Sequence, residues 1–141
     1  MSCGALAHSA EFVARLPGEK IVVPYAPQQQ LLARVAAFVT HAGAGSVMEA
    51  SFYGVPMLAI PIIVDQPANA HVVANVAKTG LQIAPEALTE ASCREALEVL
   101  LSSETIRVNT QRVRDSYRSR DGAALAAEAL LGLCGDPAGP L

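Results

Sequence analysis

The stretch His41-Ala42-Gly43-Ala44-Gly45-Ser46-Val47-Met48-Glu49 decides the fold, because it joins an apolar segment to a helical one through a glycine-rich turn. The residues before it, Ala36 to Thr40, include β-branched and aromatic side chains and predict a strand. Those from Ser46 to Phe52 predict a helix. A strand, a glycine turn and a helix start suit an anionic ligand, because glycine lets a phosphate approach the backbone and the free N–H groups favour negative charge.

Three side chains in this stretch could take part in binding such a ligand. His41, at the strand end, supplies a side-chain donor, and Ser46 supplies a hydroxyl at the N-cap or in the first turn of the helix. Glu49 follows one turn later, where its carboxylate could accept hydrogen bonds from neutral hydroxyls such as those of a ribose diol.

Two other interpretations of the turn compete with phosphate binding. The glycines could simply allow a helix to pack closely on a sheet, with His41 an ordinary residue at the strand end. Alternatively, Gly43-x-Gly45 after a strand, with Asp65 downstream, resembles a dinucleotide-binding fingerprint. Met48 occupies the third glycine position of that fingerprint, and a histidine directly before the turn is unusual for it.

The composition indicates a single folded domain with an aliphatic core. The chain has 141 residues, of which 52% are hydrophobic and 16% charged, and it contains no tryptophan. Such a composition suits helices that cover a parallel sheet. The formal net charge of −3 disfavours general nucleic-acid binding. An arginine-rich segment, which we interpret as a solvated helix face, comprises Arg107, Arg112, Arg114, Arg118 and Arg120.

The cysteines and the apolar segments bear on the compartment. Cys3, Cys93 and Cys134 are odd in number and lack the spacing of a metal site, which favours free thiols in a reducing cytoplasm. The N-terminus shows no signal-peptide pattern. The longest apolar run, Val55 to Val64, is too short to span a bilayer and contains two prolines.

Strands and helices are expected to alternate along the rest of the chain. The expected helices are Met1 to Leu16, a short one from Pro27, Ser46 to Tyr53, Pro67 to Lys78, Thr89 to Leu101, Ser103 to Arg120 and Gly122 to Leu133. The expected strands are Lys20 to Pro24, Ala36 to Thr40, Val55 to Ile60 and Leu81 to Ala84. This alternation predicts an α/β fold with a parallel sheet. Asp65 and Gln66 would follow a strand on the same rim as His41, where ligands bind in open α/β sheets.

Several motifs at fixed spacing resemble one family. They resemble the C-terminal, donor-binding half of glycosyltransferases that use nucleotide sugars and have the two-lobed GT-B fold, including bacterial macrolide and other natural-product enzymes and plant secondary-product enzymes. The elements that carry the resemblance are Tyr25-Ala26-Pro27-Gln28, His41 to Glu49, Gly54-Val55-Pro56 and Pro61 to Gln66.

The resemblance implies a Rossmann-like parallel sheet with flanking helices that lacks its first strand, which would precede residue 1. It also implies three segments, an N-terminal remnant over 1–19, a donor-binding domain over 20–133 and a flexible tail over 134–141. No metal or other cofactor is expected, and no catalytic residue is assigned to this chain. The donor would be a UDP-hexose or a dTDP-hexose.

The family pattern also implies roles for individual residues. Gln28 would contact the nucleotide base, and Tyr25 stands where plant members place a base-stacking tryptophan. Within the glycine turn, which includes Gly43, the resemblance implies that His41 contacts the diphosphate and that Gly45 and Ser46 hold phosphate oxygens.

The remaining implied roles concern the two sugars of the donor. Glu49 would bind the ribose hydroxyls, and Asp65 and Gln66 the hydroxyls of the transferred sugar. Asn69 and Ala70 match the family's Asn-Ala pair and would support that loop. Ala42 replaces a glycine found in many members.

The acceptor-binding lobe of these enzymes, with its catalytic histidine and aspartate, has no counterpart in this sequence. The small-molecule acceptor would therefore bind to a missing N-terminal lobe or to a partner chain. Three interpretations stay open: a piece of a glycosyltransferase, one chain of a split enzyme, or a non-catalytic interaction or regulatory subunit. A nucleotide-sugar epimerase is the alternative enzyme class, although the Gly-Val-Pro block and the Asp65-Gln66 pair favour transfer.

Overall fold

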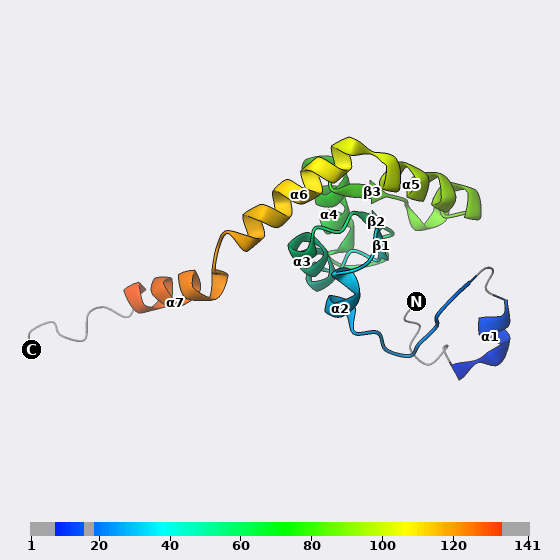
Figure 1. Cartoon of the computed structure of the whole chain (residues 1–141), viewed down its shortest axis with the longest axis horizontal. Coiled ribbons are helices and arrows are strands. Elements are labelled where there is room, and N and C mark those ends of the chain that lie inside the picture. Colours follow the sequence, from blue (N-terminus) through cyan, green and yellow to red (C-terminus); the bar gives the residue numbers. More distant parts are fainter. Residues whose placement is uncertain (1–7, 16–18, 134–141) are drawn as a thin grey trace, which may run out of the picture. The chain divides into compact units, whose positions relative to one another are not determined.

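Three parallel strands form the sheet on which most of the predicted site residues are mounted. In the computed structural model, residues 8–15 and 19–133 are described, apart from the side chains of residues 12 and 13. The chain divides into two compact units, residues 1–35 and 36–141. The described residues of the first are drawn in shades of blue in Figure 1, and the second contains the sheet.

The first unit contains two short helices, α1 (Ala10–Ala14) and α2 (Gln28–Leu32). The short helix expected from Pro27 is present, but it begins one residue later, at Gln28, and Pro27 is its N-cap. The predicted strand over 20–24 is wrong, because only Val23 forms an isolated bridge there. A strand needs a paired neighbour over several residues, and the β-branched sequence alone does not supply one.

The sheet belongs to the second unit and has the strand order β1 (Phe38–Thr40), β2 (Met57–Ala59), β3 (Gly80–Gln82). All pairs are parallel: Phe38 aligns with Met57, and Met57 with Gly80. The predicted parallel α/β class is therefore confirmed, with strands one to three residues shorter than expected. All three residues of β2 are buried, as expected for the central strand of a sheet that helices cover on both faces.

Helices flank this sheet on both sides (Figure 1). On one side, Leu58 of β2 packs with Leu100 and Ile106, which lie on α5 (Glu90–Ser102) and α6 (Glu104–Arg118). On the other, the next residue of β2, Ala59, packs with Ala42 and Ala70. Consecutive strand residues face opposite sides of a sheet, so β2 contributes to both cores.

The remaining helices of the second unit lie where the sequence predicts them, but their bounds or helix types differ from the prediction. Helix α3 (Ala44–Tyr53) ends at Gly54, whose φ of 71° is the left-handed conformation that glycine adopts without strain. Helix α4 (Gln66–His71) continues as a π-helix, η2 (Val72–Val76), which the sequence did not predict. A 3₁₀ turn, η3 (Pro85–Ala87), precedes α5. Thr89 caps α5 as expected, because its hydroxyl accepts a hydrogen bond from Ser92 N.

The arginine-rich helix α6 is only partly the solvated face that the sequence suggested. Arg118 donates from Nε to the Phe52 carbonyl at 3.0 Å, and its guanidinium lies 5.1 Å from the centre of the Phe52 ring. Arg114, which is half-buried, places its aliphatic stem against Gly54. Both arginines thus help to pack α6 against the end of α3. The aliphatic stem of Arg114 contacts Gly54, and the guanidinium of Arg118 contacts the ring and the carbonyl of Phe52.

Helix α7 (Gly122–Leu133) has the predicted bounds but does not contribute to either core. All its residues are exposed, including Leu130, Leu131 and Leu133. The predicted tail over 134–141 lies outside the described residues. No helix in the described part of the chain is both long and apolar enough to cross a membrane.

Candidate functional site

The turn between β1 and α3 holds a residue in an unusual backbone conformation. Ala42 has φ 63° and is completely buried. This left-handed conformation costs an alanine about 1–2 kcal/mol. Two neighbours support it, since Ala42 N donates to Thr40 Oγ1 at 3.2 Å and the Ala42 carbonyl accepts from Asn69 Nδ2 at 3.0 Å.

Helix α3 begins directly after this turn, with Gly43 rather than Ser46 at its N-cap. The first hydrogen bond of the helix runs from Val47 N to the Gly43 carbonyl at 3.0 Å. The amides of Gly45 and Ser46 therefore lie in the first turn, before that bond begins the helical pattern. Their N–H groups and the helix dipole form the electropositive helix start that the sequence predicts.

His41 lies against this turn and is exposed. A methyl group built on Gly43 would lie only 2.6 Å from His41 Nε2. The absence of a side chain at Gly43 therefore gives the imidazole its place beside the N-terminus of α3. Further along the helix, Ser46 and Glu49 are half-buried and three residues apart, which puts them on one face.

The loop between β2 and α4 presents the other predicted pair, Asp65 and Gln66. Asp65 is the N-cap of α4 and Gln66 is its first residue, so the helix begins one residue earlier than predicted. Gln66 Oε1 accepts hydrogen bonds from Ile62 N at 2.8 Å and Ile63 N at 3.0 Å. Because the side-chain oxygen of Gln66 already binds the loop backbone, the side-chain nitrogen of Gln66 is the group that would donate a hydrogen bond to a ligand.

A hydrogen bond links the two loops. Asp65 Oδ2 accepts from Ala44 N, the first amide of α3, at 3.3 Å, and from Asn69 Nδ2 at 2.7 Å. The structure therefore gathers the predicted phosphate turn and the predicted sugar residues at the carboxyl ends of β1 and β2, where ligands bind in open α/β sheets. An aspartate beside a helix N-terminus is also favoured by the helix dipole.

The two predicted base-contacting residues belong to the first unit. Tyr25 is largely exposed and Gln28, the first residue of α2, is half-buried. The part of these two residues in the site stays a prediction. The sequence did not indicate a role for Thr40, whose hydroxyl accepts a hydrogen bond from Ala42 N. The available signal was its position two residues before Ala42, where a threonine hydroxyl can bind the backbone of a turn.

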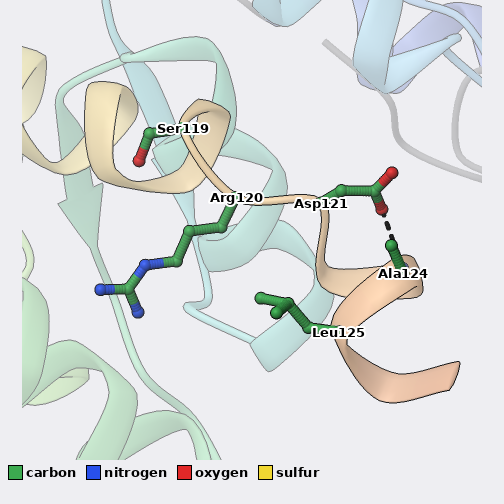
Figure 2. Close-up of a pocket in the computed structure, with 5 residues that line it drawn as sticks. All are labelled: Ser119, Arg120, Asp121, Ala124 and Leu125. Atoms are coloured by element: carbon green, nitrogen blue, oxygen red, sulfur yellow. Dashed lines mark hydrogen bonds between the residues drawn. The ribbon is translucent and has the colours of Figure 1, made fainter. Parts of the chain in front are cut away.

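A hollow of about 490 Å³ lies elsewhere, where α6 gives way to α7 (Figure 2). It is lined by Ser119, Arg120, Asp121, Ala124 and Leu125. Asp121 Oδ1 accepts from Ala123 N and Ala124 N at 3.1 and 3.0 Å, so the carboxylate is occupied at the start of α7. None of the predicted site residues lines this hollow, and we assign it no role in binding. Across the described residues, no cluster of three or more His, Cys, Asp or Glu side chains is arranged to hold a metal ion.

Parallel strands, flanking helices and a glycine turn that opens a helix define a Rossmann-like α/β domain. Residues 5–132 match the family described as erythromycin biosynthesis protein CIII-like, C-terminal domain. This match covers most of the chain, and the protein therefore belongs to that family, which confirms the resemblance inferred from the motifs.

Individual relatives agree with this assignment. The chain is 41% identical over 96 residues to anthocyanidin 3-O-glucosyltransferase 2 of Fragaria ananassa, covering 67% of this chain and 21% of that protein. The glycosyltransferase of kitacinnamycin superposes with a TM-score of 0.81 at 30% identity, over 92% of this chain and 33% of that one. A UDP-glucose:anthocyanidin 3-O-glucosyltransferase in complex with UDP superposes with a TM-score of 0.67 at 33% identity, over 72% of this chain and 24% of that one.

The chain is much shorter than these relatives. It spans between 19% and 28% of the length of the curated relatives that it matches. What is shared is thus one domain of a larger enzyme, and the predicted GT-B class holds for the domain that is present.

Proposed function

We propose that this chain is the donor-binding domain of an inverting glycosyltransferase that transfers a hexose from a UDP-hexose or a dTDP-hexose to a small-molecule acceptor. The observation that carries the proposal is the hydrogen bond between Ala44 N and Asp65 Oδ2, which joins the glycine turn to the sugar-binding loop. The relatives support it, since one of the matched structures is a UDP-glucose-dependent enzyme in complex with UDP.

The residues suit the chemistry of the transfer. When the bond between the sugar C1 and the phosphate oxygen breaks, negative charge builds on the departing nucleoside diphosphate. His41 and the amides of Gly45 and Ser46 at the start of α3 would stabilise that charge, as preorganised donors do in other active sites. The proposal invokes no metal and no further cofactor. The acceptor hydroxyl whose oxygen attacks C1, and the base that takes its proton, would both lie outside this chain.

The other groups would orient the donor. Glu49 would accept hydrogen bonds from the ribose hydroxyls, and Asp65 and Gln66 would bind the transferred sugar. Tyr25 and Gln28 would contact the base, with Tyr25 as the stacking ring. We retain the division into 1–19, 20–133 and 134–141, with the middle segment as the binding domain.

The acceptor would be bound by an N-terminal lobe or a partner chain, and a non-catalytic subunit on the same fold is the second candidate. We also propose a cytoplasmic location, because the cysteines are odd in number and Cys93 is free.

Calorimetric titration of the chain with UDP, UDP-glucose and dTDP tests the proposal. Binding of a nucleotide should fall in His41→Ala and Glu49→Ala. It should be unchanged in two matched controls at exposed positions, His71→Ala on α4 and Glu95→Ala on α5. A folded wild-type chain that binds none of the three nucleotides would favour the non-catalytic subunit.

A further inference from the structure

One side chain of α4 connects the two halves of the candidate site. The carboxamide of Asn69 has two donor hydrogens, and its Nδ2 lies 3.0 Å from the Ala42 carbonyl and 2.7 Å from Asp65 Oδ2. We propose that Asn69 is a positioning residue that builds the phosphate turn and the sugar carboxylate as one hydrogen-bonded unit. This inference rests on the proposed donor-binding function and assigns a further residue to it.

The bond to Ala42 acts on the phosphate turn. Ala42 is held at φ 63°, a conformation that residues with a side chain avoid, and it is followed directly by the N-cap of α3. A change at Ala42 therefore changes the direction in which Gly43 and the first turn of α3 leave the sheet. By binding the Ala42 carbonyl from α4, Asn69 favours the backbone conformation that aims the N-terminus of α3 at a phosphate.

The bond to Asp65 acts on the sugar loop. Asp65 uses the same oxygen, Oδ2, for Asn69 and for Ala44 N. Within the described part of the chain, Oδ1 takes part in no hydrogen bond, and it is the oxygen that would accept from a sugar hydroxyl. Asn69 and Ala44 thus fix the carboxylate so that one oxygen is held by the protein and the other is presented to a ligand.

These contacts close a ring that runs from Ala42 through Asn69 and Asp65 to Ala44 and back along the chain. Asp65 therefore has a second role besides contacting the sugar, because its carboxylate accepts a hydrogen bond from Ala44 N, the first amide of α3. It follows that removing either Asn69 or Asp65 weakens binding of a nucleotide without any sugar. A residue that only contacted the sugar would leave that affinity unchanged.

The test compares Asn69→Leu, which keeps the number and branching of the side-chain heavy atoms but removes the hydrogen-bonding groups, with Asn75→Leu as the matched control. Asn75 lies on η2, is exposed, and its Nδ2 lies 3.2 Å from His71 Nδ1. We expect the affinity for UDP and for UDP-glucose to fall about tenfold in Asn69→Leu, and to stay within about twofold in Asn75→Leu. Wild-type affinity for UDP in Asn69→Leu would overturn the proposal.

A double-mutant cycle separates positioning from a general loss of stability. Asp65→Ala alone should lower UDP affinity, and Asp65→Ala with Asn69→Leu should lower it by less than the product of the two single losses, because both variants break the hydrogen bond between Asn69 and Asp65. For Asp65→Ala with Asn75→Leu, any fold-loss in UDP affinity caused by Asn75→Leu should multiply the fold-loss caused by Asp65→Ala. Multiplying losses in the Asn69 cycle would contradict the proposal.

A readout without nucleotide keeps this inference distinct from the proposed function. Hydrogen exchange of the Ala44 amide, followed by NMR on the free chain, should accelerate about tenfold in Asn69→Leu and remain unchanged in Asn75→Leu. If the wild-type chain binds no nucleotide, the proposed function fails, and this measurement still decides whether Asn69 orders the turn. Equal exchange rates in all three proteins would refute it.

Discussion

Gly43→Ala should disable the proposed phosphate-binding turn between β1 and α3 while leaving the domain folded. The new methyl group would lie 2.6 Å from His41 Nε2, whereas an ordinary contact needs about 3.4 Å or more, so the ring must move by about 0.8 Å. The neighbouring atom is the far end of a side chain, which can swing away. The backbone of Gly43, with φ −62° and ψ 146°, is one that alanine adopts freely.

The expected magnitudes follow from this geometry. A hydrogen bond from His41 to a charged phosphate is worth about 1.5–3 kcal/mol, so its loss should weaken UDP binding about 10- to 100-fold. Stability should change by less than about 1 kcal/mol. Alanine is a poorer N-cap than glycine, but it also reduces the entropy of the unfolded chain, and the two effects oppose each other.

The assay combines calorimetry with UDP and thermal unfolding of the same variants. Gly132→Ala, on the exposed helix α7, is the matched control, because its added methyl group would meet no other part of the described chain within 4 Å; it should bind UDP as the wild type does. Gly43→Ala combined with His41→Ala should bind no more weakly than His41→Ala, since the methyl group acts through the imidazole. Wild-type affinity in Gly43→Ala, or further weakening in the double variant, would refute the reasoning.

Three further predictions concern the fold. Gly80→Ala should lower the free energy of unfolding in urea by about 3 kcal/mol or more, because the added methyl group would lie 2.0 Å from the Met57 carbonyl oxygen of the paired strand. A variant as stable as the wild type would show that the two strands can move apart to make room for the methyl group. Leu58→Ala should cost about 2–5 kcal/mol, since Leu58 is completely buried between the sheet and α5; a cost below about 1 kcal/mol would contradict that packing. Arg107 donates hydrogen bonds to the Glu104 carboxylate and lowers its pKa, so the stabilisation from this pair should be present above the ordinary carboxyl pKa and lost as the pH falls through the lowered one. Carboxyl NMR titration should show Glu104 returning to its ordinary range in Arg107→Gln, and an unchanged titration would exclude the pairing in solution.

The sequence predicted those elements whose signals are local. Thr89 caps α5 because its hydroxyl reaches an amide three residues away, and Gly54 ends α3 because the left-handed position favours glycine. The motif spacing also placed Asp65 beside the glycine turn, since parallel strands end on a common rim.

Features that depend on distant partners could not be predicted. The apolar run over 20–24 has the side chains of a strand, but only Val23 forms a bridge, because pairing needs a neighbour that local pattern does not specify. The π-helix over 72–76 and the double role of the Asn69 amide likewise depend on how α4 packs beside the turn at Ala42. Sequence reasoning named Asn69 as a supporting residue, and only the structure shows which atoms it holds.

The most direct test of the central claim is an NMR titration of the ¹⁵N-labelled chain with UDP. If this is a donor-binding domain, the amide signals of Gly43, Gly45 and Ser46 should shift most, with smaller shifts around Asp65. No shift at the turn between β1 and α3, or shifts confined to the hollow from Ser119 to Leu125, would contradict the account.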